Sequence, residues 1–233
     1  MQDKYADETS KHFYPGTETL INKFGIKDGT ELYKVERELV MYRIAELYHH
    51  PIKGAFDLKH LQAIHYYLFQ DIYDWAGIIR DCNIAKQETV FCLAEFIPNY
   101  AESIFGELAN DNYYINDDYE IKIYKLAKFF SDVNALHPFR EGNGRSQRIF
   151  IEWLSKISGI EVDLTKINKD EMCEASQYGM MCRYEKLIEI FKKNSYLLNK
   201  KEHLESVQLL LKSNNKKQTI ELIKKEHQKV LKL

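Results

Sequence analysis

Apolar residues recur along most of this chain at the three- and four-residue spacing of an amphipathic helix. The first such stretch covers residues 30–50, where Thr30 stands in the position of a helix cap and Glu31 follows in the first turn. Its regularly spaced apolar residues are Leu32, Val35, Leu39, Ile44 and Leu47. The pattern predicts one helix over this stretch.

The same periodicity predicts a series of further helices. One begins after the cap Asp57, one near Ala94, and one at Asn116, which runs to His137. Another follows the glycines near residue 143 and ends at Gly159, a residue typical of helix C-caps. We expect a further helix over about 170–193, and two amphipathic segments joined at 213–215 in the tail.

Residues 82–92 show a different pattern, with two short arms of β-favouring residues on either side of a polar turn. We interpret them as a small hairpin. With only 4 prolines and 10 glycines in 233 residues, the chain as a whole is expected to be mainly α-helical with one β-hairpin. We divide it into an N-terminal lead-in (1–29), a core (30–195) and a lysine-rich helical tail (196–233).

Charge and composition exclude several classes of protein. Lysine and arginine number 33 and acidic residues 35, so the formal charge of −2 gives no argument for a nucleic-acid partner or an anionic membrane. No apolar signal core and no run of about 18 apolar residues is present. Four cysteines without paired spacing indicate a reducing compartment, and we expect a cytoplasmic protein.

The stretch HPFREGNGRSQR, residues 137–148, concentrates the candidate chemistry. A helix that begins near Asn143 offers unpaired N–H groups and the positive end of its dipole to an anion. Gly142 and Gly144 allow a phosphate to approach the backbone. Arg145 and Arg148 lie three residues apart and project from one side of this helix, which suits a di- or triphosphate.

Two further residues of the stretch suggest how phosphate chemistry would proceed. A carboxylate beside phosphate needs a cation, so Glu141 is the candidate Mg²⁺ ligand. His137 can exchange a proton near neutral pH and is the candidate general base. Each residue alone has an ordinary structural explanation: a helix-terminal histidine, surface arginines, a glycine turn. Their joint occurrence at this spacing predicts transfer to phosphorus.

These residues resemble the signature of the Fic (Fido-fold) family, His-x-Phe-x-(Asp/Glu)-Gly-Asn-Gly-Arg-x-x-Arg, with every fixed position filled. The segment 56–86 and the region around YPGT (14–17) also resemble the family, so that the resemblance covers about residues 13–195. It implies a Fic-type helical core and a protein adenylyltransferase, which moves AMP from ATP to a Ser, Thr or Tyr hydroxyl of a target protein and releases pyrophosphate.

The resemblance assigns a role to each residue of the motif. His137 would be the base, Glu141 would hold Mg²⁺ against the α- and β-phosphates, and Arg145 would reach the β-phosphate. Arg148 would bind the γ-phosphate, while Asn143 and the loop amides, including those of Gly142 and Gly144, would contact phosphate oxygens. Relatives that phosphorylate carry lysine at the position of Gly144, so this residue favours nucleotidyl transfer.

Two other expectations follow from the resemblance. The hairpin at 82–92 matches the family's flap, in which Lys86 and Val90 would help to dock the target as an added β-strand; an ordinary exposed turn is the alternative. The inhibitory motif (Ser/Thr)-x-x-x-Glu-(Gly/Asn) of many relatives is missing. We therefore expect either a small antitoxin-like partner, acting on a toxin, or an unrestrained enzyme.

Two alternatives remain open at the level of sequence. One is a different phosphoryl or nucleotidyl transfer by the same site, and the other is a non-catalytic module that binds a nucleotide or nucleic acid. The near-zero charge and Glu141 argue against nucleic acid. We expect no membrane partner and a location in the cytoplasm, either that of the producing cell or that of a second cell reached through a secretion system.

Overall fold

The computed structural model describes residues 6–7, 10–86 and 89–230. Its helices are α1 (Gly29–His49), α2 (Leu58–Phe69), α3 (Ile97–Asn110), α4 (Tyr119–Leu136), α5 (Asn143–Ser158), α6 (Lys169–Met180), α7 (Glu185–Lys193), α8 (Lys200–Leu210) and α9 (Ser213–Val230). Single 3-10 turns are η1 (Ser10–His12), η2 (Ala94–Phe96), η3 (Asn112–Tyr114) and η4 (Leu164–Lys166). The strands are β1 (Ala6–Asp7), β2 (Ile84–Lys86), β3 (Thr89–Val90), β4 (Ile160–Val162) and β5 (Ser195–Leu197).

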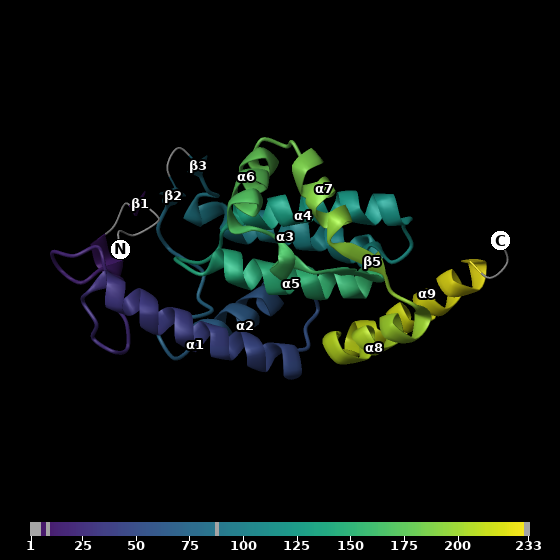
Figure 1. Ribbon diagram of the computed structural model, residues 1–233, viewed down its shortest axis with the longest axis horizontal. Helices are drawn as coiled ribbons and strands as arrows, with labels where there is room; N and C mark the ends of the chain where they lie inside the picture. Colours follow the sequence, from purple (N-terminus) through teal and green to yellow (C-terminus); the bar gives the residue numbers. More distant parts are fainter. Residues whose placement is uncertain (1–5, 8–9, 87–88, 231–233) are drawn as a thin grey trace.

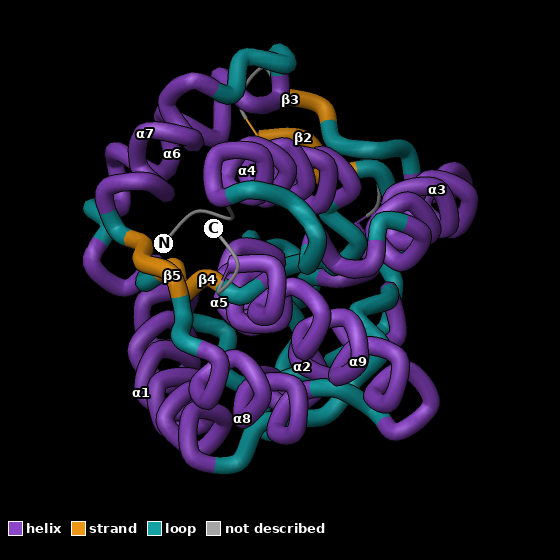
Figure 2. The backbone as a smooth tube through the Cα atoms, turned by 90° about the vertical axis from the view of Figure 1, so that its right-hand side faces the viewer, coloured by secondary structure: helices purple, strands orange, loops and turns teal. Residues whose placement is uncertain are grey.

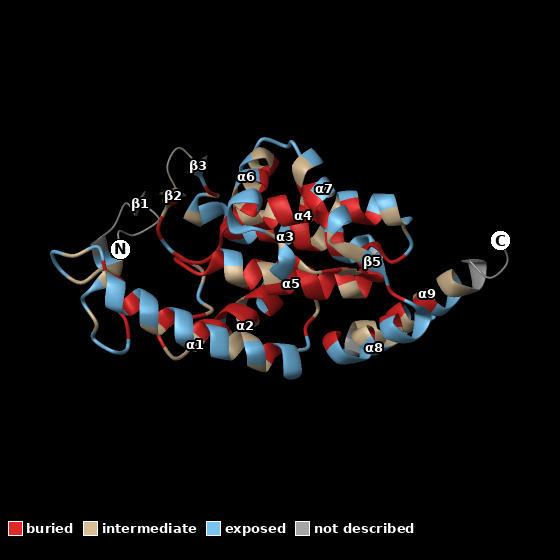
Figure 3. Cartoon of the chain, in the orientation of Figure 1, coloured by how far each residue is buried: buried red, intermediate tan, exposed pale blue. Residues whose placement is uncertain are grey.

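Helices α4 and α5 form the centre of the molecule (Figures 1 and 2). Helices α1 and α2 cover one side of this pair and α6 and α7 the other, while α8 packs against α5. Buried residues are concentrated in the central helices, as Figure 3 shows. Phe150, Leu154 and Ile157 of α5 are fully buried, as their helical spacing predicts. The mainly helical fold class is therefore confirmed.

The caps show where the helices begin. Asp57 caps α2, as predicted, because its side chain accepts a hydrogen bond from the His60 amide. The prediction of Thr30 as the cap of the first helix is wrong: Asp28 accepts from the Glu31 amide at 2.8 Å, and the helix already begins at Gly29. Both are good caps by residue type, and the aspartate lies in the extended conformation that a cap requires.

The single helix predicted over 170–193 is wrong. The chain forms two helices, α6 and α7, separated by a turn at 181–184 in which Cys182 has a φ of 58°. Gly179, in the last turn of α6, lets this helix lie close to α4, because a Cβ there would lie 2.0 Å from the Ser131 hydroxyl. The close approach of α6 to α4 is a tertiary contact that helical periodicity does not encode.

The predicted hairpin is present as β2 and β3, and it carries a third strand, since β1 pairs with β2 in antiparallel fashion. The prediction of one hairpin missed a second sheet. In that sheet β4, directly after α5, pairs with β5 at the start of the tail. This pairing joins segments more than thirty residues apart, and it brings the tail back to the central helix.

The tail forms the two predicted amphipathic helices, α8 and α9, although they meet at 211–212 rather than at 213–215. Leu211 forms a bridge with Gly54, which precedes α2, and this contact places the junction. The tail residues in the core are Val207, Leu210, Leu211 and Ile223. In the described part of the chain, no helix is both long enough and apolar enough to cross a membrane.

Candidate active site

The loop between α4 and α5 is held by two left-handed backbone conformations at its ends and by a side chain that packs into the core. His137 closes α4 in the left-handed conformation (φ 42°), and Gly142 opens α5 in the same region (φ 80°). Phe139 between them is fully buried, and its ring stacks on that of His65 of α2 with 3.8 Å between the ring centroids. A Cβ on Gly142 would lie 2.3 Å from the Phe69 ring, so only glycine fits there.

His137 is held as a neutral imidazole. Its Nδ1 lies 2.9 Å from the Asn134 carbonyl oxygen, which can only accept, so Nδ1 carries the hydrogen and Nε2 the lone pair. The His137 ring stacks on that of Phe91 with 3.7 Å between the ring centroids. Burial lowers the pKa of His137 to about 3, and the hydrogen bond to Asn134 opposes only part of that shift. The predicted base is thus unprotonated at neutral pH.

Arg80 connects the His137 loop to both arms of the hairpin. Its Nε donates to the His137 carbonyl at 2.8 Å, and its Nη1 donates to the Cys82 carbonyl at 2.6 Å. Its Nη2 donates to the carbonyl of Cys92. A guanidinium with these three acceptors fixes the base of the hairpin relative to the His137 loop, a role that the sequence did not reveal.

His65 is a second residue whose structural role sequence reasoning missed. Its Nδ1 accepts from the Gly77 amide at 2.8 Å, so its Nε2 carries the hydrogen and donates to the Glu141 carbonyl at 2.9 Å. Burial lowers the pKa of His65 to about 3. The neutral ring therefore connects the loop after α2 to the motif, and a histidine on an apolar helix face was its only sequence signal.

The start of α5 has the features of an anion site. The Asn143 side chain is used within the loop: it accepts from the Phe139 amide at 2.8 Å and donates to the Phe139 carbonyl at 2.7 Å. The N–H groups of Asn143 and Gly144 have no hydrogen-bond acceptor among the residues that the structure describes. Gly144 is exposed with open space around its Cβ position, so an oxyanion can approach these amides.

The two arginines of the motif have different surroundings. Arg145 pairs with Glu141 at 3.2 Å and with Glu36 of α1 at 2.7 Å. Arg148 makes no hydrogen bond or ion pair with any described residue, although it is half-buried. Burial, and next the charge of Arg145, lower the pKa of Arg148 from its ordinary value. A cation in this situation is stabilised by an incoming anion.

Glu152 follows Arg148 by one helical turn but is used elsewhere. Its carboxylate accepts from the Tyr48 hydroxyl at 2.6 Å and from the Leu164 amide at 3.0 Å. Burial raises the pKa of Glu152. It therefore joins α1, α5 and η4 and leaves Arg148 available to a ligand.

A cavity of about 190 Å³ brings part of the predicted site together, whereas Glu141, Gly142, Asn143 and Arg145 lie outside its lining. His137, Gly144 and Arg148 line it from the motif, and Lys86 and Thr89 line it from the flap. Residues of α6 close the opposite side: Lys169, Met172, Cys173, Ser176, Gln177 and Met180. Val90 lies outside this lining on β3 and is 62% exposed. The α5 side of the cavity thus carries the positive charge of Arg148, and the α6 side mixes polar residues with two methionines.

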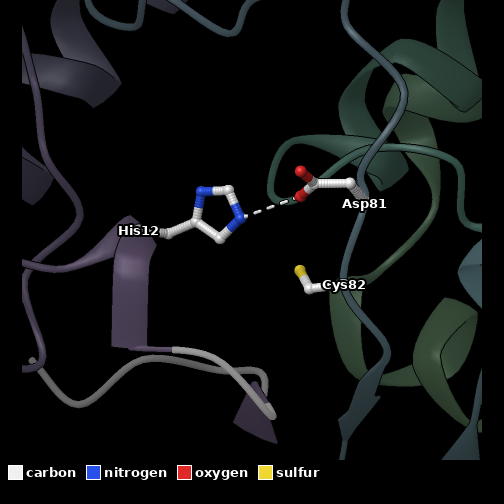
Figure 4. Close-up of side chains that lie close together, drawn as sticks. All are labelled: His12, Asp81 and Cys82. Atoms are coloured by element: carbon white, nitrogen blue, oxygen red, sulfur yellow. Dashed lines mark ion pairs between the residues drawn. The ribbon is translucent and has the colours of Figure 1, made fainter.

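A separate cluster of potential metal ligands joins the N-terminal segment to the base of the flap (Figure 4). His12 Nε2 lies 3.4 Å from Asp81 Oδ1, and the Cys82 sulfur completes a group within 4.8 Å. Lys11 already pairs with Asp81 at 2.5 Å, and Arg80 lies on the Cys82 carbonyl. These positive charges favour an ion-pair cluster over a bound cation.

Comparison with known proteins agrees with this geometry. The Fic/DOC family model matches residues 55–155, which include α2, the flap and nearly all of α5. The probable protein adenylyltransferase Fic of Escherichia coli (strain K12) is 32% identical over 193 residues, 83% of this chain and 96% of that protein. The chain belongs to the Fic/DOC family.

Other members of the Fic/DOC family extend the likeness. The protein adenylyltransferase VbhT of Bartonella schoenbuchensis is 36% identical over 74% of this chain and 36% of its own length. The crystal structure of BepC from Bartonella tribocorum with bound AMPPNP has a TM-score of 0.74 and 28% identity, and covers 81% of this chain and 98% of its own. A Fic domain of a Bartonella quintana cell filamentation protein with bound ADP has a TM-score of 0.75 and 27% identity, covering 81% and 96%.

Proposed function

We propose that this chain is a protein adenylyltransferase, which transfers AMP from ATP to a Ser, Thr or Tyr hydroxyl of a target protein. The observation that carries the proposal is one cavity shared by a neutral histidine and Arg148, an arginine in the second turn of α5 that has no hydrogen-bond or ion-pair partner among the described residues. Triphosphate oxygens have partners there in Arg148 and the amides of Asn143 and Gly144. Relatives named as protein adenylyltransferases and structures with nucleotides support the assignment.

His137 would perform the proton transfer. Its Nε2 takes the proton from the target hydroxyl as that oxygen attacks the α-phosphorus, and the bond to the β-phosphate oxygen breaks to release pyrophosphate. The hydrogen bond from Nδ1 to Asn134 orients the ring and supports the imidazolium that forms. The negative triphosphate raises the pKa of the imidazole beside it, which makes it a stronger base when substrate is bound.

Glu141 fits a divalent cation in this site. Its carboxylate is buried beside the α5 amides, and Mg²⁺ commonly takes one or two protein carboxylates together with phosphate oxygens and water. When bound, Mg²⁺ would neutralise charge on the α- and β-phosphates. The Gly142 amide donates to Oε1 at 2.9 Å and orients the carboxylate. Arg145 donates a hydrogen bond to the same oxygen and would reach the β-phosphate from beside Glu141.

The flap would position the target. Lys86 contributes to the wall of the cavity beside His137, while Val90 is exposed on β3, where an extended target segment could add as a further strand. Arg80 holds both arms of the flap on the His137 loop, so a strand docked there is placed relative to the base.

We also propose that a small antitoxin-like protein restrains the enzyme by placing a carboxylate on Arg148. The half-buried guanidinium lacks an anionic partner in the described chain, so it can accept one from another protein. An enzyme without that partner would act as a toxin in the cytoplasm of the producing cell, or of a second cell if a secretion system delivers it. Related solved domains are described as VirB-translocated effectors.

The test uses ATP labelled at either the α- or the γ-phosphate, incubated with Mg²⁺, the purified chain and cell lysate. Protein-bound label from the α-phosphate alone is the expected result. Label from the γ-phosphate alone would identify a kinase instead. Absence of protein-bound label from any nucleotide, with nucleotide or nucleic acid retained, would identify a binding module and overturn the proposal.

A further inference from the structure

A carboxylate far outside the motif contacts the motif's first arginine. Glu36 lies on α1, more than a hundred residues from Arg145, and its Oε1 is 2.7 Å from Arg145 Nη1. Glu36 is 8% exposed, so this is a buried ion pair rather than a surface contact. Helix α1 thus contributes a charge to the site that α5 and its preceding loop otherwise form.

The contact is built from several sides. The Tyr73 hydroxyl donates to Glu36 Oε2 and fixes the carboxylate. The Arg145 guanidinium lies over the Phe69 ring, 4.6 Å from its centroid, and its Nη2 is 3.2 Å from Glu141 Oε1. The planar guanidinium therefore has an aromatic ring on one face and a different carboxylate at each amino group.

Two carboxylates share this single guanidinium, and the sharing affects Glu141. A divalent cation at Glu141 must compete with the positive charge of Arg145 for the same carboxylate. Glu36 offsets that charge and holds Nη1 on its own side. Without the charge of Glu36, the guanidinium would act on Glu141 alone, and its repulsion of a cation would no longer be offset.

We propose that Glu36 is a positioning residue for the transfer reaction, which holds Arg145 between α1 and the motif and thereby keeps Glu141 available to a divalent cation. The inference rests on the proposed function, in which Glu141 is the metal ligand. It adds a second carboxylate-bearing element to the site and gives α1 a part in catalysis that the motif does not specify.

The test is Glu36→Gln, which removes the charge but keeps an oxygen for Arg145. Mn²⁺ binding is measured by electron paramagnetic resonance with AMPPNP present, and metal-free AMPPNP binding by calorimetry. We expect the Mn²⁺ affinity to fall at least about fivefold, because the negative charge of Glu36 is lost. Metal-free AMPPNP, an anion, should bind more tightly. Glu38→Gln on the exposed face of the same helix is the control and should change neither value.

Opposite shifts for cation and anion separate this role from a structural one, since partial unfolding would weaken both. Glu36→Asp retains the charge and should restore most of the Mn²⁺ affinity. If Glu36→Gln does not fold, Glu36→Met, which also removes the charge and keeps a side chain of similar length, should weaken Mn²⁺ binding in the same sense. Unchanged Mn²⁺ binding in the variant that folds, or weakening of both ligands together, overturns the inference. A wild-type chain that binds no Mn²⁺ with AMPPNP would instead contradict the metal site itself.

Discussion

At the scale of single residues, the two glycines of the motif serve different purposes. Gly142 has a positive φ and the Phe69 ring against its Cβ position, whereas Gly144 has open space. We expect Gly142→Ala to lower the free energy of unfolding by at least about 1–3 kcal/mol, the cost of the strained backbone before the clash is counted. Chemical denaturation measures this loss.

Gly144→Ala is the matched control for that prediction. Its position is inside α5, where alanine is favoured over glycine, so the free energy of unfolding should stay unchanged or rise by up to ~1 kcal/mol. Equal losses of stability in both variants would contradict the account of Gly142.

Arg148 is the residue whose substitution should act on nucleotide affinity with little effect on folding. It makes no hydrogen bond or ion pair in the described chain, so Arg148→Ala should remove no polar contact on which the fold depends. We expect ATP to bind about tenfold to a hundredfold more weakly, in line with the loss of a charge-assisted hydrogen bond. Calorimetric titration with AMPPNP measures the change. Arg183→Ala, at an exposed arginine, should bind as the wild type does.

At the scale of elements, buried histidines connect helices to neighbouring segments through backbone carbonyls. His60 Nε2 lies 2.9 Å from the Ile52 carbonyl, and His203 Nε2 of α8 lies 2.7 Å from the Ile157 carbonyl of α5. Burial lowers the pKa of both to about 4, and that of His65 and His137 to about 3. Each ring must therefore be neutral for its element to remain packed.

A pH dependence of stability follows from these four histidines. Their pKa values in the folded chain lie below the unfolded value near 6.5, so between pH 6.5 and 4 the unfolded chain binds more protons. As far as these groups are concerned, the free energy of unfolding should be constant above that window. Inside the window it should decrease as the pH is lowered. Each histidine contributes up to ~1.4 kcal/mol per pH unit.

Denaturant titration at several pH values measures this slope. His203→Gln keeps a donor for the Ile157 carbonyl and removes one titrating group, so its slope should be smaller than that of the wild type by one histidine's share. A stability that is flat from pH 7 to pH 4.5 would contradict the assignment of neutral buried rings.

The elements also show how far the sequence could predict the structure. Helix periodicity and the caps at Asp57 and Gly159 placed α2 and the end of α5, because both signals are local. Gly179 meets Ser131 only where α6 packs on α4, and Glu36 reaches Arg145 only after α1 packs on the core. Such contacts join distant segments, and no local pattern reports them. The motif predicted the site's residue types, whereas the supporting roles of His65 and Arg80 required coordinates.

At the scale of the whole molecule, the tail belongs to the core. Strand β5 pairs with β4, α8 packs on α5, and Leu211 bridges to Gly54. A chain that ends at Leu198 would lose Val207, Leu210, Leu211 and Ile223 from the interior. At about 1.5–3 kcal/mol for each buried side chain, the loss is several kcal/mol, enough to unfold a marginally stable protein.

Thermal unfolding and limited proteolysis of the shortened chain test this expectation. A control chain that ends at Lys229 keeps all four side chains and should melt as the full chain does. If the chain ending at Leu198 had the same melting temperature as the full chain, the tail would be an appendage rather than part of the core.

In the proposed reaction, a neutral His137, placed beside the α5 amides and Arg148, removes the proton of the attacking hydroxyl. The most direct measurement compares wild type and His137→Ala for two quantities: transfer of the labelled α-phosphate to protein, and affinity for AMPPNP. We expect transfer to fall by about 10²-fold or more while nucleotide affinity stays within a few-fold, because the ring acts on the hydroxyl and not on the phosphates. Undiminished transfer by the variant would contradict it.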